Sequence, residues 1–171
     1  MDTKIVYREL SKEDKDQYRC LLTEVTQTLQ RKDFFIPPPG FADNLFVEGY
    51  ARSIGAFDND KLIGIATLLL EQNQKYKEKL DASDKKVCEL GNYLVAEQYR
   101  GQGIIQVLQS KLLEIAKQLN FDIVMATVHP DNISSLKTLQ KELEIVKTFE
   151  IEDGIERFLM RKNIIRTVDG K

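Results

Sequence analysis

The spacing of hydrophobic positions changes several times along the chain, and each change predicts a new element. Residues 4–10 (KIVYREL) alternate apolar and polar side chains, which is typical of a strand. Ser11 followed by Asp14 indicates a capping box at the start of a helix. The helix is expected to run to about residue 30, because the apolar positions after the box recur every three or four residues. They are Tyr18, Leu21, Leu22, Val25 and Leu29.

Prolines interrupt this periodicity. The segment FFIPPPG (34–40) cannot be helical, because each proline lacks an N–H donor and has a fixed φ, so we expect a loop. A short helix is expected at 43–52. Two β-rich runs within 52–71 then surround Asp58-Asn59-Asp60, residue types that tolerate turn dihedrals, which predicts a hairpin.

The middle of the chain alternates between strand and helix signals. The polar segment 72–86 is expected to be a solvated connection or frayed strand ends, with a partner-binding patch as the alternative. Residues 87–95 (VCELGNYLV) are expected to form a buried strand. Between 104 and 119 the apolar residues stay on one face of an amphipathic helix. The continuous apolar run 121–128 (FDIVMATV) predicts an inner strand.

The last part of the chain contains one more helix and a hairpin. Pro130, Asp131 and Asn132 are helix start signals, and leucines at 136, 139 and 143 mark its buried side. EIVKTFEI and IERFLMR, joined by a turn at 152–154, form a closing hairpin. The whole order predicts a single α+β domain over residues 1–171. Its core is a mixed, mostly antiparallel sheet of about six or seven strands flanked by helices.

Composition and charge narrow the class of partner. A formal net charge of -2 and a pI near 5.6 argue against nucleic acid, because the phosphate backbone requires a basic face. No apolar run approaches the roughly 20 residues that cross a bilayer, and the N-terminus lacks the features of a signal peptide. We therefore expect no membrane partner and a cytoplasmic location. Cys20 and Cys88 form no CxxC pair, so we expect reduced, partly buried thiols and no metal site.

Two glycines stand immediately before the helix at 104, in Arg100-Gly101-Gln102-Gly103-Ile104. Unpaired N–H groups and the positive end of the helix dipole at such a turn attract anions, although a simple capped turn explains the same residues. A Walker A loop is excluded because no GK[ST] follows. A dinucleotide fingerprint is excluded because Gln106 stands where the third glycine would be.

A longer stretch around these glycines resembles a known motif. VCELGNYLVAEQYRGQGIIQVL is similar to motif A of the GNAT N-acetyltransferase superfamily, whose signature is Arg or Gln, two residues, Gly, one residue, then Gly or Ala. Arg100 and Gly103 match, whereas Ile105 departs from the small residue of the family. A register that begins at Gln98 also fits the formula, but only the Arg100 register puts Leu108 at the family's helix leucine. MATVHPDNISSLKTLQKEL resembles motif B, and the order of elements agrees over nearly the whole chain.

The resemblance implies that acetyl-CoA is the co-substrate and that the acetyl group moves to a primary amine by direct attack in a ternary complex. The acceptor would be a small molecule or a protein, and the chain a monomer or homodimer. By the same analogy, the backbone of Tyr93, Leu94 and Val95 binds the pantetheine arm. Asn132 helps to hold the same arm, or only caps its helix. The amides implied for the pyrophosphate belong to Arg100, Gly101, Gln102, Gly103, Ile104, Ile105 and Gln106.

The resemblance also implies catalytic positions. Glu89 matches the general base of the histone-acetylating branch, which would take a proton from an amine that is protonated at neutral pH; alternatively it is an acidic residue of a polar cleft with no catalytic duty. The tyrosine that protonates the leaving thiolate in many members is replaced by Leu139, so water would serve. His129 is either a proton shuttle or a loop histidine without a catalytic part. Thr127 replaces the glutamate of the ribosomal-protein branch.

Acceptor specificity is expected from residues 34–44 and 151–157. Phe34, Phe35 and Phe41 either line a pocket for an apolar or aromatic acceptor or cover the sheet. Three functions remain open at this point. They are N-acetyltransfer, a catalytically silent CoA-binding regulatory module of the same fold, and a phosphate-binding protein of another fold.

Overall fold

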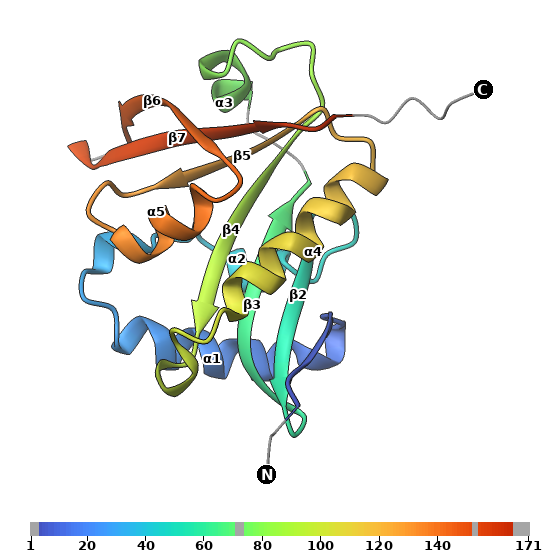
Figure 1. Ribbon diagram of the computed structural model, residues 1–171. Helices are drawn as coiled ribbons and strands as arrows, with labels where there is room; N and C mark the ends of the chain where they lie inside the picture. Colours follow the sequence, from blue (N-terminus) through green and yellow to red (C-terminus); the bar gives the residue numbers. More distant parts are fainter. Residues whose placement is uncertain (1–3, 71–73, 152–153, 166–171) are drawn as a thin grey trace.

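Seven strands form one sheet in the order β1-β2-β3-β4-β5-β7-β6 (Figure 1). The computed structural model describes residues 4–70, 74–151 and 154–165. Only the β4–β5 pair is parallel; every other neighbouring pair is antiparallel. This arrangement confirms the predicted fold class. The strands are β1 Val6–Glu9, β2 Ala51–Asp58, β3 Lys61–Leu69, β4 Val87–Val95, β5 Ile123–Val128, β6 Glu144–Glu150 and β7 Glu156–Asn163.

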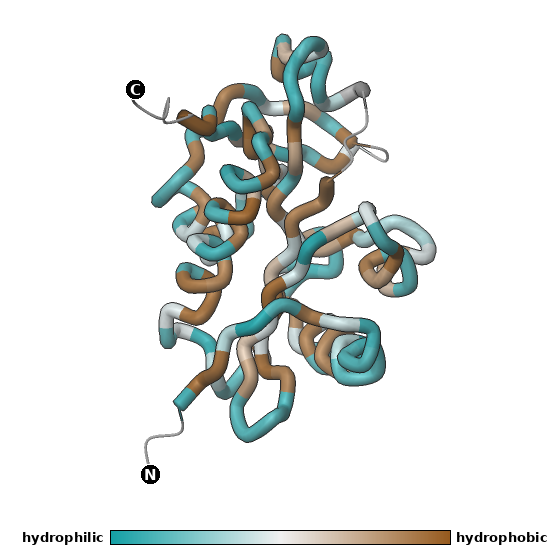
Figure 2. The backbone as a smooth tube through the Cα atoms, turned by 90° about the vertical axis from the view of Figure 1, so that its right-hand side faces the viewer, coloured by the Kyte–Doolittle hydropathy of each residue, from teal (hydrophilic) through white to brown (hydrophobic). Residues whose placement is uncertain are grey.

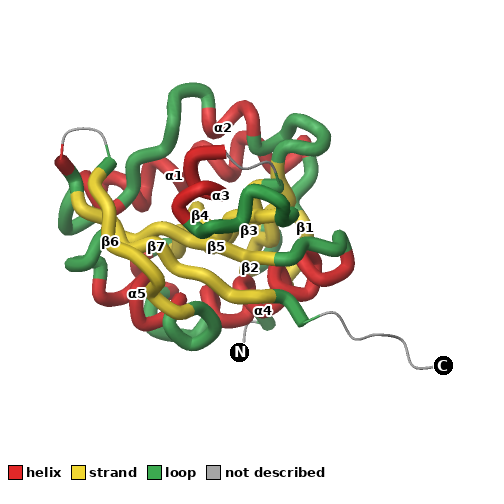
Figure 3. The backbone as a smooth tube through the Cα atoms, turned by 90° about the horizontal axis from the view of Figure 1, so that it is seen from above, coloured by secondary structure: helices red, strands yellow, loops and turns green. Residues whose placement is uncertain are grey.

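Helices cover both faces of the sheet. Figure 3 shows α1, α2 and α3 on one face and α4 and α5 on the other. We call them the α1 face and the α4 face. Figure 2 shows the longest hydrophobic stretches in the strands and alternating hydrophobic and hydrophilic positions in the helices, as amphipathic covering helices require. The helices are α1 Lys15–Gln27, α2 Phe41–Asn44, α3 Gln74–Lys79, α4 Ile104–Gln118 and α5 Ile133–Leu139, with 3-10 turns at Lys12–Asp14, Lys32–Phe34 and Glu97–Tyr99.

The structure contains the capping box and the hairpin turn that short sequence patterns predicted. The Ser11 N–H donates to the Asp14 carboxylate at 2.8 Å, which confirms the capping box. Arg8 binds the same carboxylate at 2.8 Å and holds its pKa at about 2. Asn59 and Asp60 adopt φ values of 46° and 64°, so they form the two-residue hairpin turn that their types favour.

Two expectations about the connections are wrong. The helix expected at 43–52 is the short α2, and Ala51 already pairs with Leu69 as the first residue of β2. Strand pairing overrides the weak helical pattern there. The connection expected at 72–86 contains α3, because Tyr76 and Leu80 bury apolar surface against the sheet despite their polar neighbours. Residues 71–73 and 152–153 lie outside the described residues, so most of the turn predicted at 152–154 is not described.

The cysteines differ from each other: Cys88 is buried and Cys20 is exposed, contrary to the expectation of partial burial for both. None of the helices in the described part of the chain combines the length and the apolar character that crossing a bilayer requires.

A bulge in β4 makes this central strand part from β5. The β3–β4 register moves from Thr67↔Gly91 to Ile65↔Leu94, so β4 holds one extra residue. Asn92 occupies the bulge with φ of 54°. On the other side, β4 pairs with β5 only from Val87 to Glu89. The second half of β4 therefore leaves the sheet open between the two central strands.

Candidate functional site

A cavity of about 660 Å³ occupies this opening. Its walls are residues 90–95 of β4, the glycine turn before α4, residues 127–139 around α5, and residues between 25 and 35 at the end of α1. Tyr93 and Val95 pack with the core on the α4 face, whereas Leu29 and Phe35 pack with the core on the α1 face. The cavity thus passes from one face of the sheet to the other.

The glycine turn forms one end of the cavity. Gly101 and Gly103 have φ of 76° and 77°, a region that side chains other than glycine rarely adopt. A Cβ on Gly103 would meet nothing nearer than the Gln106 side chain at 3.7 Å, so the requirement is conformational rather than spatial. The first bond of the helix runs from the Val107 N–H to the Gly103 carbonyl at 3.3 Å. The N–H groups of the preceding turn are therefore available to an anion.

Two of the seven residues whose amides are expected around the pyrophosphate are placed differently from the rest. The Arg100 N–H donates to the Glu97 carbonyl at 3.2 Å, so this donor is already used within the 3-10 turn. Gln102 does not contribute to the cavity wall, and its side chain donates to the Gln98 carbonyl at 3.3 Å. The cavity is lined instead by Gly101, Gly103, Ile104, Ile105 and Gln106.

The Arg100 side chain ties the turn to its surroundings. Its Nε donates to the Val95 carbonyl at 3.1 Å, and its terminal nitrogen donates to the Thr28 hydroxyl at 2.9 Å. Sequence reasoning considered only the backbone of Arg100. The structure shows that its side chain lies along the cavity and reaches the end of α1.

The main-chain groups of β4 alternate in direction. The Ala96 N–H donates to the Ile63 carbonyl of β3, while the Val95 carbonyl faces the cavity side, where Arg100 reaches it. By alternation, the main-chain groups of Tyr93 face the cavity and those of Leu94 face β3, with which Leu94 pairs through Ile65. Of the three residues expected to bind the pantetheine arm, Tyr93 and Val95 have suitably directed groups and Leu94 does not.

The Tyr93 side chain connects three elements. Its hydroxyl donates to the Gln109 side chain at 2.6 Å, and Gln109 donates to the Thr138 carbonyl at 3.3 Å. Burial raises the pKa of Tyr93 well above its ordinary value, so the phenol stays protonated. Tyr93 thereby fixes β4, α4 and α5 relative to one another beside the cavity.

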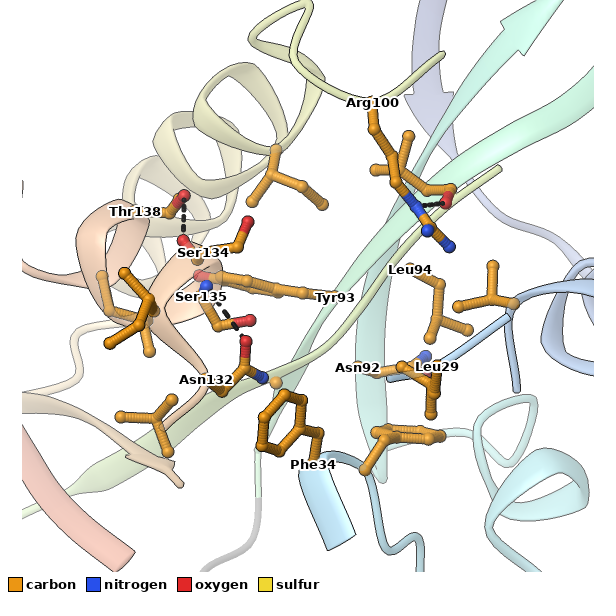
Figure 4. A pocket seen from close by; sticks show the side chains of 18 of the residues that line it. Leu29, Phe34, Asn92, Tyr93, Leu94, Arg100, Asn132, Ser134, Ser135 and Thr138 are labelled. Carbon is orange, nitrogen blue, oxygen red and sulfur yellow. Dashed lines mark hydrogen bonds between the residues drawn. The ribbon is translucent and has the colours of Figure 1, made fainter. Parts of the chain in front are cut away.

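The α5 wall is rich in hydroxyl groups. Asn132 accepts from the Ser135 N–H at 3.4 Å, which is the N-cap arrangement, and it also lines the cavity (Figure 4). Ser134, Ser135 and Thr138 line it too, and sequence reasoning missed them. Leu139 is 4% exposed and provides an apolar side chain at the same wall.

Lys141 is a further residue that the sequence did not single out. Its Nζ lies 3.1 Å from the Gln106 amide when that amide is oriented to donate to the Gly103 carbonyl at 3.0 Å. A cation therefore stands beside the glycine turn. Its signal in the sequence is weak, because nothing local links the end of α5 to the start of α4.

Glu89 lies outside the cavity wall. It shares the α1 face with Val87, because side chains alternate along a strand and Val87 packs there with Ile123 and Met125. Burial raises the pKa of Tyr50 and of Tyr76, and the nearby Glu89 carboxylate raises both further, so it lies close to the two phenols. The candidate base thus lies on the α1 face, one residue before Leu90, where the β4 part of the cavity wall begins.

His129 belongs to a network beside the cavity. It is buried, its Nδ1 accepts from the Asp131 N–H at 3.1 Å, and its Nε2 lies 3.4 Å from the Asp33 carboxylate. Both ring nitrogens therefore have partners. This arrangement favours the loop histidine over the proton shuttle.

The three phenylalanines divide between the two expected roles. Phe34 and Phe35 are half-buried and line the cavity, whereas Phe41 is 6% exposed and packs into the core on the α1 face. The proline-rich loop therefore both covers the sheet and forms part of the cavity wall.

Comparison with known proteins agrees with this geometry. The sequence profile of the Acetyltransferase (GNAT) family matches residues 9–144. The chain belongs to the GNAT acetyltransferase family. No curated protein sequence matches the chain.

Solved structures share the GNAT fold over nearly the full length. A GNAT-family acetyltransferase from Streptococcus pneumoniae superposes with a TM-score of 0.71 at 19% identity, covering 94% of this chain and 100% of that one. An N-acetyltransferase from Staphylococcus aureus gives 0.70 at 15% identity, with 94% and 97% covered. FeeM, an N-acyl amino acid synthase from uncultured soil microbes, gives 0.72 at 13% identity, with 94% and 91% covered. At these identities the likeness shows the fold alone.

Proposed function

We propose that this GNAT protein is an N-acetyltransferase that uses acetyl-CoA and acetylates a primary amine by direct attack in a ternary complex. One observation carries the proposal: a single cavity joins the glycine turn to open strand groups and continues through the sheet. Such a cavity allows a thioester and an amine to enter from opposite faces of the sheet and to meet inside the protein.

The residues present fit the elongated, phosphate-bearing acetyl-CoA. The amides of Gly101, Gly103 and the first turn of α4 would bind the pyrophosphate, with the positive charge of Lys141 nearby. The main-chain groups of Tyr93 and Val95 would pair with the amides of the pantetheine arm. Binding at Val95 requires the Arg100 side chain to release the carbonyl that it holds, or to share it.

The chemistry proceeds by acyl transfer to nitrogen. The ammonium group loses a proton to become the amine, whose lone pair forms a bond to the thioester carbon. The carbon–sulfur bond then breaks to release CoA as thiolate, and the nitrogen gives its second proton to water as the amide forms. A backbone N–H of β4 directed at the thioester oxygen would stabilise the developing negative charge. Such donors are effective because the folded strand already holds them in place.

Glu89 is proposed as the base. It lies on the α1 face, from which the amine would approach, and would accept the ammonium proton through water because it is not part of the cavity wall. Leu139 cannot protonate the thiolate. A thiol pKa near 8.5 makes the thiolate a sufficiently good leaving group for water to complete the step.

A catalytically silent CoA-binding module is the second candidate. Leu139 is apolar and buried at the cavity, Ile105 is bulky at the turn, and Glu89 lies outside the wall. These observations are compatible with binding that leads to no reaction.

Two measurements separate the candidates. Thermal stabilisation by acetyl-CoA reports binding, and release of free CoA thiol with a panel of amines, amino acids and peptides reports transfer. Stabilisation with thiol release supports the enzyme, and stabilisation without release from any acceptor supports the module. An absence of stabilisation by acetyl-CoA contradicts both, and stabilisation by ATP or NAD instead would indicate another phosphate ligand.

A further inference from the structure

We infer that the acceptor amine is attached to an apolar group of aromatic size, which packs against Phe34 and Phe35 at the α1 end of the cavity. The inference rests on the proposed function, because it names the acceptor of that same site. Four features of the cavity support it: direction, composition, rigidity and charge.

The two ends of the cavity correspond to the two substrates. Arg100, at the glycine turn, and Phe34 lie at opposite ends of the view in Figure 4. Acetyl-CoA bound at the turn would occupy the Arg100 end. The acceptor then reaches the thioester from the Phe34 end, which borders solvent at the exposed Gln30.

The Phe34 end is apolar in composition. Phe34 and Phe35 are half-buried and face the cavity there, and Val25 and Leu29 add further apolar side chains to the cavity wall. Large apolar side chains that line a concave, partly open site provide the surface on which an apolar ligand group gains most from leaving water.

The wall at this end is rigid. The centroid of the Phe34 ring lies 5.4 Å from that of the His129 ring, and the Arg31 guanidinium carbon lies 5.2 Å from the Phe34 ring centroid. Arg31 in turn binds Asp33 and Asp131, each at 2.5 Å, and a terminal nitrogen of Arg157 donates to the Asp33 carbonyl at 2.6 Å. A ring held in place in this way loses little freedom when a ligand packs against it.

Charge distinguishes apolar acceptors from other amines. In the described part of the chain, the charged residues of the cavity wall are Arg100 and Asp131. Arg100 is engaged at the other end by Val95 and Thr28, and Asp131 is paired with Arg31. Neither residue offers an uncommitted charge to the second ammonium of a diamine or to the carboxylate of an amino acid. An amine that is attached to a neutral, apolar group therefore matches this wall better than a diamine or an amino acid does.

The test measures amine binding and transfer separately. Calorimetry on CoA-saturated protein compares 2-phenylethylamine with putrescine and glycine, and CoA thiol release from acetyl-CoA is followed with the same amines. We expect 2-phenylethylamine to bind roughly tenfold to hundredfold more tightly, as burial of an aromatic group allows. Peptides that begin with Phe or with Ser show whether the apolar amine comes from a small molecule or from a chain terminus.

Two variants connect the preference to the wall. Phe34→Ala should remove it, whereas Phe158→Ala, which truncates a half-buried phenylalanine of β7 outside the cavity wall, should retain it. Stabilisation by CoA should persist in both. If Phe34→Ala is too unstable to use, Phe34→Leu keeps an apolar side chain and should reduce the preference for phenyl over cyclohexyl amines.

The possible failures are distinguishable. Thiol release with polar amines and no preference for 2-phenylethylamine would overturn the inference and leave the proposed function intact. Selective binding of 2-phenylethylamine without thiol release would support the inference and contradict the proposed transfer. A preference for hexanoyl-CoA over acetyl-CoA that Phe34→Ala abolishes would overturn the inference, because the apolar end would then hold the acyl chain.

Discussion

Asn92 provides a sharp test of how this fold opens its sheet. It is 6% exposed and sits in the β4 bulge with φ of 54°. Its carbonyl oxygen accepts from the Tyr18 hydroxyl at 3.1 Å, and its amide donates to the Thr67 hydroxyl at 3.0 Å. Burial raises the pKa of Tyr18 to about 12, so this hydroxyl remains a donor well above neutral pH. We predict that these two bonds and the φ tolerance of asparagine hold the bulge in place.

The expected loss of unfolding free energy in Asn92→Ala is the sum of hydrogen-bond and backbone contributions. Asn92→Ala removes two buried hydrogen bonds, each contributing about 1 kcal/mol net, and leaves the Tyr18 hydroxyl unpaired at a cost of roughly 1–3 kcal/mol. Alanine at this φ adds about 1–2 kcal/mol. The free energy of unfolding should therefore fall by at least about 4 kcal/mol. Asn92→Gly loses the same bonds but adopts the φ freely, so after its larger chain entropy it should be roughly 1 kcal/mol more stable than Asn92→Ala.

Urea unfolding measures both free energies, and thermal stabilisation by CoA reports whether the cavity survives. Asn92→Gly should keep the bulge and most of the CoA response, whereas Asn92→Ala should lose more of that response because a regular strand competes with the bulge. A loss of less than about 1 kcal/mol in Asn92→Ala would refute the reasoning. So would a glycine variant that is less stable than the alanine variant.

Three further changes test the site and the fold. Gly103→Val should abolish stabilisation by CoA, while Gly49→Val, at φ of 80° with open space around it, should lose similar fold stability and keep the CoA response; equal CoA responses would contradict the pyrophosphate placement. Glu89→Gln should lower turnover roughly 10²- to 10⁴-fold with unchanged CoA affinity and flatten the acidic limb of the pH–rate profile; an unmoved profile would exclude Glu89 as the base. Asp14 has a pKa lowered from 3.8 to about 2, so its carboxylate stabilises the fold above pH 4 and that contribution disappears as the pH falls towards 2. Asp14→Asn should therefore cost about 1–2 kcal/mol at pH 7, because half-exposed Arg8 is screened by solvent, and almost nothing at pH 2; unfolding curves with the same gap at both values would disprove this.

The sequence by itself determined the features that depend on neighbouring residues. The capping box at Ser11, the Asn59-Asp60 turn and the glycines before α4 each need a particular backbone conformation within a few residues, and residue type alone favours it. Periodicity within each segment was sufficient for the order of the strands and the longer helices, but not for α3. Resemblance to motif A then located the turn that lines the cavity.

Tertiary structure decided the shape of the site. The bulge depends on Tyr18 reaching Asn92 across 74 positions, and the anchored Phe34 wall depends on Arg31 reaching Asp131 across 100. It also separated Phe34 from Phe41, directed Tyr93 but not Leu94 towards the cavity, and brought Lys141 to the turn. No local pattern encodes such contacts, because their energy arises only when distant segments pack together and bury the same groups from water.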